Sequence, residues 1–322
     1  MTQYAWWPWV RLGLTLAFFC AVAMLLIRYS REVEWGAVWK TVRANTPTTL
    51  MLAAALTVVS HGLFASFDLI GRNTTGHRLS VPRVLSVAWV SYVFNLNLGA
   101  LLGGAGFRFR LYSQLGLDKG VIAQVYGLSV VTNWLGLTML LGGALLLTPI
   151  ALPDDWQLGH QAQTILGVVL PLVALAYLVA CFWMPGRSWH WRAVHFTMPS
   201  GRTALIQQLL SSLNWLVVAG VITILLRQQV AYTEVVGVTL LAAVAGVVIH
   251  VPGGLGVLEA VFVAMLGSDL PRHDILGALL AYRALYYLAP LVLAVIVFAV
   301  MEAGLRKHPA AHPASNVQQP AQ

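Results

Sequence analysis

Five charged side chains lie inside or beside long apolar stretches of this sequence, where an ionised group needs a partner or a function. They are Asp68, Arg108, Arg110, Glu259 and Arg283. A charge at the centre of a membrane helix costs about 2.5–3.5 kcal/mol or more, so each is a functional candidate. A guanidinium binds a phosphate through two parallel hydrogen bonds. A carboxylate can pair with a cationic headgroup or exchange a proton. The set suits the binding of a phosphate-bearing headgroup, such as that of a phospholipid.

Each of these side chains also has a purely structural interpretation. Arg108 or Arg110 can extend its charge to the membrane surface. Glu259 can stabilise the start of a helix through the helix dipole. Arg283 can form a fixed ion pair with Glu259 or Asp68, and Asp68 can simply face the headgroups near the end of its span. The sequence leaves these alternatives open.

Other polar residues within apolar spans are expected to support the site. These are Asn133, Asn214 and Tyr286. Asparagine in a membrane helix more often joins helices by hydrogen bonds than binds a ligand. The sequence contains no residues with the spacing of metal ligands, no nucleophile with a matching base and no nucleotide-binding loop. We therefore predict no metal, no cofactor and no catalytic residues.

Two glycine-rich breaks interrupt apolar runs and define the predicted hinges. The break residues are Gly103, Gly104, Gly106, Pro252, Gly253, Gly254 and Gly256. Proline lacks the N–H donor and glycine is costly inside helices. Broken backbone at membrane depth is tolerated only where it is buried in protein or lines a cavity. Paired glycine-interrupted segments are typical of a transporter site near the bilayer midplane, built from an inverted repeat.

The composition indicates an integral membrane protein. Of 322 residues, 59% are hydrophobic and 9% are charged, whereas soluble domains have about 25% charged residues. The net charge of +8 does not indicate a nucleic-acid partner, because the basic residues lie in short loops between apolar spans.

The predicted fold is an all-α polytopic membrane protein with about six full transmembrane helices and two re-entrant broken-helix hairpins. The full spans are residues 10–27, 48–70, 121–147, 165–184, 203–226 and 275–301, and the hairpins are residues 84–117 and 235–266. Residues 35–43 form an amphipathic surface helix or an ordinary connecting helix. Residues 1–303 make a single transmembrane domain with repeated halves at about 48–147 and 203–301. Residues 304–322 are expected to form a disordered cytoplasmic tail.

The distribution of basic residues suggests the topology. The loop at residues 149–163 has no Lys or Arg and is expected outside, whereas the tail with Arg306 and Lys307 is expected inside. The 235–266 hairpin then enters from outside and the 84–117 hairpin from inside. Charge counting gives equal totals for an alternative in which residues 84–117 cross fully, so symmetry alone favours the hairpin model.

Five stretches together resemble a known family: NLNLGALLGGAGFRFRLYSQLG, SVVTNWLG, SSLNW, AGVVIHVPGGLGVLEAVF and LLAYRALYYLAPLVLA. They resemble the YbhN-type inner-membrane proteins, within the larger family of the lysylphosphatidylglycerol synthase transmembrane region. Its best-known member is the flippase half of the bacterial multiple peptide resistance factor. The resemblance covers about residues 10–301. It implies a bacterial inner-membrane protein that moves phospholipids between leaflets. Unlike that factor, this sequence has no room for an aminoacyl-transferase domain, so no lysyl-lipid synthesis is expected.

Three functions are compatible with the sequence. The first is a flippase or scramblase without an ATP site, either passive or driven by an ion or proton gradient. The second is a non-transporting membrane subunit that binds lipid and presents it to a lipid-synthesising partner enzyme. The third is an intramembrane enzyme, which the absence of a nucleophile or metal set argues against. A homodimer is compatible with each of them.

Single-cysteine variants at Arg31 and Arg78 test the hairpin topology, which places the C-terminus in the cytoplasm of a multi-pass inner-membrane protein. We expect Arg31→Cys to react with a membrane-impermeant maleimide in intact cells, and Arg78→Cys to react only after permeabilisation. Labelling of residue 78 from outside alone would contradict the model.

Overall fold

The computed structural model describes residue 36 and residues 45–147, 160–191, 194–249 and 254–307. The predicted span at residues 10–27 and the helix at residues 35–43 therefore lie outside the described residues, except for residue 36. Only the first four residues of the predicted tail are described, and they end a helix.

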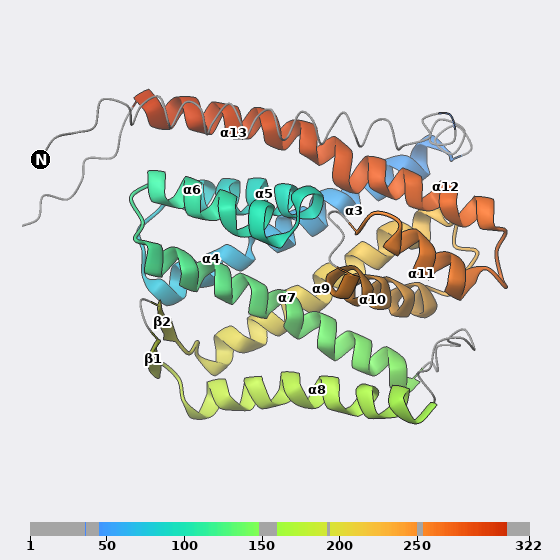
Figure 1. The fold of residues 1–322 in the computed structure, drawn as a ribbon, viewed down its shortest axis with the longest axis horizontal. Coiled ribbons are helices and arrows are strands. Elements are labelled where there is room, and N and C mark those ends of the chain that lie inside the picture. Colours follow the sequence, from blue (N-terminus) through green and yellow to red (C-terminus); the bar gives the residue numbers. More distant parts are fainter. Residues whose placement is uncertain (1–35, 37–44, 148–159, 192–193, 250–253, 308–322) are drawn as a thin grey trace, which may run out of the picture. The chain divides into compact units, whose positions relative to one another are not determined.

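Helices make up almost all of the described chain (Figure 1). In order they are α3 (Pro47–Ala65), α4 (Phe67–Thr75), α5 (Val81–Leu98), the π-helix η1 (Ala100–Gly106), α6 (Phe107–Gln114), α7 (Lys119–Leu147), α8 (His160–Trp183), α9 (Gly201–Leu225), α10 (Tyr232–Ile249), α11 (Val257–Leu266), α12 (Arg272–Tyr282), the π-helix η3 (Arg283–Leu288) and α13 (Ala289–Lys307). Two short antiparallel strands, β1 (Ser188–Trp191) and β2 (Val194–Thr197), pair in the α8–α9 connection and were not predicted.

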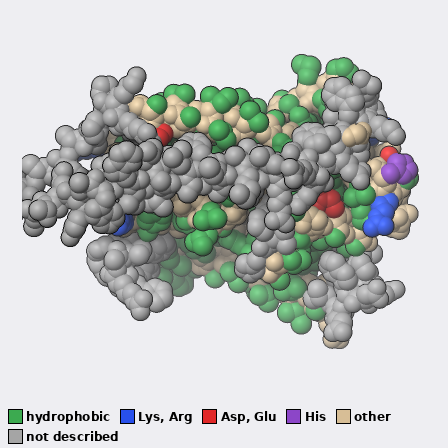
Figure 2. Space-filling model, turned by 45° about the horizontal axis from the view of Figure 1, so that its top comes forward, with side chains coloured by type: hydrophobic (Ala, Val, Ile, Leu, Met, Phe, Trp, Pro, Cys, Tyr) green, Lys and Arg blue, Asp and Glu red, His purple; other side chains and the backbone are tan. Residues whose placement is uncertain are grey.

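Six helical segments of the described residues are long and apolar enough to cross a membrane. They are Pro47–Thr75, Lys119–Leu147, Gln161–Trp183, Gly201–Leu225, Tyr232–Ile249 and Arg272–Gly304. Five of these match predicted full spans, and the sixth, α10, was predicted as one arm of a hairpin. Figure 2 shows hydrophobic side chains over much of the visible described surface. The all-α polytopic membrane fold is confirmed.

Local bonds explain how the first span begins and bends. Pro47 opens α3, where its missing N–H costs nothing, and the Thr46 hydroxyl accepts a hydrogen bond from the Thr49 N–H. At the junction with α4, the Ser66 hydroxyl donates to a carbonyl one turn earlier, a bond that bends helices. The first turn of α4 then carries Asp68 into the interior.

The first predicted hairpin is present as two helical arms that pack side by side, α5 against η1 and α6. The chain reverses at Gly99, whose φ of +83° favours glycine. A Cβ at Gly103 would collide with the carbonyl of Phe94, and the rings of Phe94 and Phe107 stack with centroids 3.9 Å apart. The break predicted at residues 103–106 is therefore a wide helical turn, and the reversal lies four residues earlier.

The second hairpin consists of α10 and α11, which also pack against each other. Gly254 and Gly256 have φ of +57° and +76° and lead into α11. Pro252 and Gly253 lie outside the described residues. Both predicted hairpins thus exist as paired helices, whereas their entry into a membrane from one side and their inverted relation stay predictions.

The last predicted span is helical throughout, but a π-helical segment interrupts the α-helix in its middle. The π-helix η3 separates α12 from α13. Pro290 is the second residue after it and has no N–H, so the carbonyl of Tyr286, four residues earlier, lacks its α-helical donor. A π turn at this point accommodates that missing bond.

Helix α9 lies at the centre of the packing. A large apolar cluster joins it to α10, α11 and α12, and a second joins it to α7 and α10. Where α9 crosses α7, a Cβ at Gly136 would collide with the backbone of Ser211. The Ser211 hydroxyl there accepts from the Gly136 N–H at 3.2 Å. Such close crossings of small residues drive helix association in lipid.

Two alanine variants on the same helix test this crossing. Gly136→Ala should destabilise the protein by about 1–3 kcal/mol, because the added methyl overpacks the α7–α9 contact. Gly143→Ala is the control, since a Cβ there has no atom within 4 Å. Thermal unfolding in detergent, followed by loss of the monodisperse species, measures both. Equal melting temperatures would contradict the packing.

Candidate functional site

Asp68 and Arg108 form a doubly hydrogen-bonded ion pair in the interior. The Nε–Oδ2 and Nη2–Oδ1 distances are both 3.0 Å. The Tyr112 hydroxyl donates to the same carboxylate at 3.0 Å, and Nη1 of Arg108 donates to the Gly104 carbonyl at 3.3 Å. Asp68 is completely buried, so the alternative in which it faces headgroups near a span end is wrong. The pair joins α4 to α6.

His77 lies in the loop next to this pair, with its ring 6.3 Å from that of Tyr112. Burial lowers the pKa of His77, and the positive charge of Arg72 lowers it further, while the carboxylate of Asp68 opposes both. The ring is therefore neutral at pH 7 and adds no charge beside Arg108.

Glu259 and Arg283 form the second pair, at the start of α11. Arg283 donates through Nε to one carboxylate oxygen of Glu259 and through Nη2 to the other at 2.9 Å. Nη2 also donates to the Gly254 carbonyl at 2.9 Å, and the guanidinium lies 5.6 Å from the Tyr287 ring centroid. The Arg283 side chain is 4% exposed and that of Glu259 is 19% exposed. This pair is thus more accessible than the Asp68–Arg108 pair.

Arg110 forms a third pair with Glu302, which sequence reasoning missed. Nη2 of Arg110 lies 3.0 Å from Oε1 of Glu302, and the Gln114 amide also donates to this carboxylate. The Arg110 side chain is 29% exposed and that of Glu302 is 10% exposed. Glu302 directly follows the apolar run of the last span, and an acidic residue in that position was the signal available.

The three arginines thus have three different carboxylate partners. We expected Glu259 to be grouped with Arg108, Arg110 and Arg283, and the structure pairs it with Arg283. Arg108 and Arg110 pair with Asp68 and Glu302 instead.

Uncharged polar groups meet between α3, α5, α9 and η3. The Tyr286 hydroxyl lies 2.7 Å from Ser60 Oγ and 2.8 Å from the Tyr92 hydroxyl. Ser60 Oγ donates to Asn214 Oδ1 at 2.7 Å, and His61 Nε2 lies 3.2 Å from the Tyr286 carbonyl. Of these five, sequence reasoning singled out Asn214 and Tyr286.

Asn133 enters the α7–α9 contact through its backbone. Its carbonyl accepts from the Ser211 hydroxyl at 3.0 Å and from the Trp215 indole at 3.1 Å. Any residue at this position would supply that carbonyl, so the supporting role predicted for the Asn133 side chain stays a prediction.

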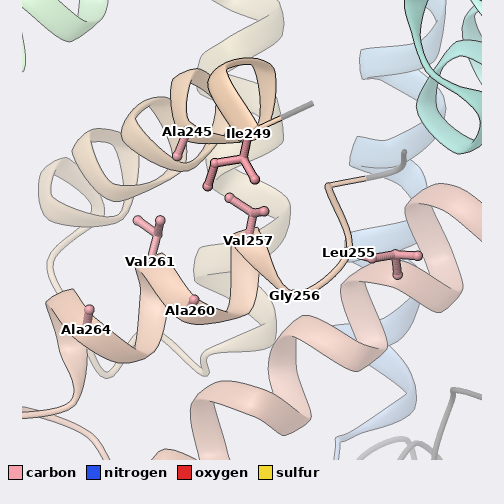
Figure 3. Close-up of a pocket in the computed structure, with 8 residues that line it drawn as sticks. All are labelled: Ala245, Ile249, Leu255, Gly256, Val257, Ala260, Val261 and Ala264. Atoms are coloured by element: carbon pink, nitrogen blue, oxygen red, sulfur yellow. The ribbon is translucent and has the colours of Figure 1, made fainter. Parts of the chain in front are cut away.

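An apolar cavity of about 390 Å³ lies between α10 and α11 (Figure 3). Its lining residues are Ala245, Ile249, Leu255, Gly256, Val257, Ala260, Val261 and Ala264. In Figure 3, Val257 and Val261 point from α11 towards α10. Glu259 is on the same helix, but it comes two residues after Val257, so its side chain leaves α11 on a different face from the residues that line the cavity.

Comparison with known proteins assigns the family. Residues 10–294 match the model of the lysylphosphatidylglycerol synthase transmembrane region. The chain belongs to this family. The resemblance noted from the sequence is thereby confirmed.

The proteins similar to this chain include some of about the same length and some that are longer. The chain is 40% identical to inner membrane protein YbhN of Escherichia coli over 302 residues, which are 94% of this chain and 95% of that protein. It is 29% identical to an uncharacterized protein of Synechocystis over 80% of each. It is 30% identical to the phosphatidylglycerol lysyltransferase of Staphylococcus haemolyticus over 73% of this chain and 27% of that protein.

All three charged pairs fall within or next to the region that matches the lysylphosphatidylglycerol synthase family. Asp68, Arg108, Arg110, Glu259 and Arg283 lie within residues 10–294, and Glu302 lies just beyond it. The family assignment therefore covers both hairpins and the ion pairs of Arg108 and Arg283.

Neutralising one carboxylate at a time should separate the buried pair from the partly exposed one. Asp68→Asn leaves Arg108 buried without a counter-charge and should cost about 3–5 kcal/mol. Glu302→Gln should cost less than about 1 kcal/mol, because water reaches Arg110. The double variant Asp68→Asn with Arg108→Gln should recover part of the loss. Thermal unfolding measures all three, and equal stability of the two single variants would refute the assignment.

Proposed function

We propose that this protein translocates phospholipid headgroups across the bacterial inner membrane as a flippase or scramblase without an ATP site. The observation that carries the proposal is the Glu259–Arg283 pair. It lies directly after the Gly254–Gly256 turn of the second hairpin and is partly exposed, and another face of the same helix lines an apolar cavity. A zwitterionic or anionic headgroup requires such charges, and its acyl chains require apolar surroundings.

The pair can act by exchanging partners. A headgroup phosphate competes with the Glu259 carboxylate for the planar fork of Arg283. A headgroup ammonium pairs with the released carboxylate. Because one ion pair replaces another, the headgroup passes without leaving a bare charge in the apolar interior. Reclosure of the Glu259–Arg283 pair completes the step.

The other charged residues take different roles in this proposal. Arg108 is enclosed by Asp68, Tyr112 and Gly104, which favours an anchoring role for it and for Asp68. Arg110 is more exposed, and its pair with Glu302 offers a second station for the phosphate. The glycine turns at Gly99 and Gly254–Gly256 supply the backbone freedom that opening requires.

The relatives support a lipid substrate and an inner-membrane location. The lysyltransferases are named for phosphatidylglycerol, and the Escherichia coli relative is named as an inner membrane protein. We propose that this protein lies in the inner membrane, with the hairpins entering from opposite sides and the C-terminus in the cytoplasm. We propose that it moves lipid without modifying it.

The lysyltransferase relatives also favour a second function. In the Staphylococcus haemolyticus protein, the similar region covers 27% of the chain. In that relative, the similar membrane region is therefore part of a longer chain that is named as a lipid-modifying enzyme. By analogy, the present protein could be a separate subunit that presents lipid to a partner enzyme. That function predicts copurification with such an enzyme and no intrinsic translocation.

Reconstitution in liposomes tests the proposal. Fluorescent phospholipids in the inner leaflet should become accessible to an impermeant quencher faster with the protein than without it. The double variant Glu259→Gln with Arg283→Gln leaves no unpaired buried charge and should slow translocation about tenfold or more, which corresponds to a barrier higher by about 1.4 kcal/mol.

The control variant removes a positive charge outside the proposed site. Arg83→Gln removes an exposed arginine and should leave the rate unchanged. Equal exchange in liposomes with and without the wild-type protein would rule out the transport function and leave the lipid-presenting subunit.

A further inference from the structure

The π-helix η3 contacts both hairpins through two side chains. Arg283, its first residue, pairs with Glu259 on α11 in the second hairpin. Tyr286, three residues later, bonds through its hydroxyl to Tyr92 on α5 in the first hairpin. One helical turn therefore joins an arm of each hairpin.

We propose that Tyr286 and His61 are positioning residues that hold η3 in its wide turn and thereby keep Arg283 on Glu259. The inference rests on the proposed function for its consequence in transport, but it also makes a claim about the protein alone. In that claim, η3 couples the second hairpin to the first.

The His61 bond explains how the wide turn is maintained. Pro290 cannot donate to the carbonyl of Tyr286 as an α-helix would require. His61 Nε2 lies 3.2 Å from this oxygen, and a carbonyl only accepts, so Nε2 carries the hydrogen. His61 is 3% exposed, and its Nδ1 has no hydrogen-bond partner among the described residues. The side chain thus supplies the donor that the proline lacks.

The hydroxyl groups around Tyr286 form a series of hydrogen bonds in which each group donates to the next. Ser60 uses its only hydrogen on Asn214 Oδ1, so the Tyr286 hydroxyl must donate to Ser60. The Tyr92 hydroxyl must then donate to Tyr286. Donors aligned in sequence polarise one another and strengthen the chain. This series of hydrogen bonds fixes the orientation of the Tyr286 side chain with respect to α3, α5 and α9.

A change of register would break this arrangement. Removing the extra residue of a π turn rotates one flanking helix by about 100° relative to the other, since an α-helix has 3.6 residues per turn. Arg283 and Tyr286 could then not both keep their partners. The bonds to Tyr286 and the bond to Glu259 therefore stabilise the same register.

Hydrogen–deuterium exchange of the full-length protein in detergent tests this coupling without any lipid. Pro290→Ala restores the backbone donor and favours an ordinary α-helix, so exchange in Val257–Leu266 should rise about fivefold or more. Tyr286→Phe and His61→Leu should act in the same direction. His61→Gln keeps an N–H donor and should restore protection. Pro171→Ala, which changes a proline inside α8, is the matched control and should leave Val257–Leu266 unchanged.

Translocation in liposomes adds a second readout. Tyr286→Phe should slow transport about fivefold in the wild-type background and have no further effect in the Glu259→Gln, Arg283→Gln double variant, because it acts through that pair. Unchanged exchange in Val257–Leu266 for both Pro290→Ala and Tyr286→Phe overturns the coupling. Raised exchange with no translocation by the wild type supports the coupling and refutes only the proposed transport function.

Discussion

Charge neutralisation in an apolar interior is the constraint on which this structure depends. Asp68 and Arg108 are both almost inaccessible, and either one alone would be several kcal/mol too costly to bury. Since they lie on α4 and α6, the requirement that they meet fixes one arm of the first hairpin against the first described span. Tyr112 completes the arrangement by donating to the same carboxylate. The helices around this pair must therefore assemble together.

Missing backbone donors shape the second site in a comparable way. Pro290 leaves the Tyr286 carbonyl without its helical partner, and a π turn with an external donor, His61, takes its place. Wide turns of this kind are frequent at functional sites, and here the turn contains Arg283. The same backbone irregularity thus positions Arg283, whose carboxylate partner, Glu259, is 19% exposed.

Apolar run length was enough to predict five of the spans, because a helix needs about 20 apolar residues to cross a bilayer. The sites were less predictable, since pairing depends on which helix faces meet. Asp68 looked peripheral along the chain, yet α4 turns it inward. Glu302 was overlooked next to the end of an apolar run. The reversal at Gly99 was assigned to the glycines at 103–106, of which Gly103 instead permits close packing on Phe94.

The positions of the two ion pairs give the hairpins different mechanical properties. Arg108 lies nine residues beyond the reversal at Gly99, whereas Glu259 lies three residues beyond Gly256. The Asp68–Arg108 pair therefore holds the first hairpin far along its returning arm, whereas the Glu259–Arg283 pair holds the second hairpin near its tip. An ion pair near the tip acts at the greatest distance from the base of the hairpin and therefore opposes rotation of the hairpin most strongly. A single exchange of partners breaks this ion pair. In the transport that we propose, the α10–α11 hairpin is therefore the part that moves, and the α5–α6 hairpin is the part that stays fixed.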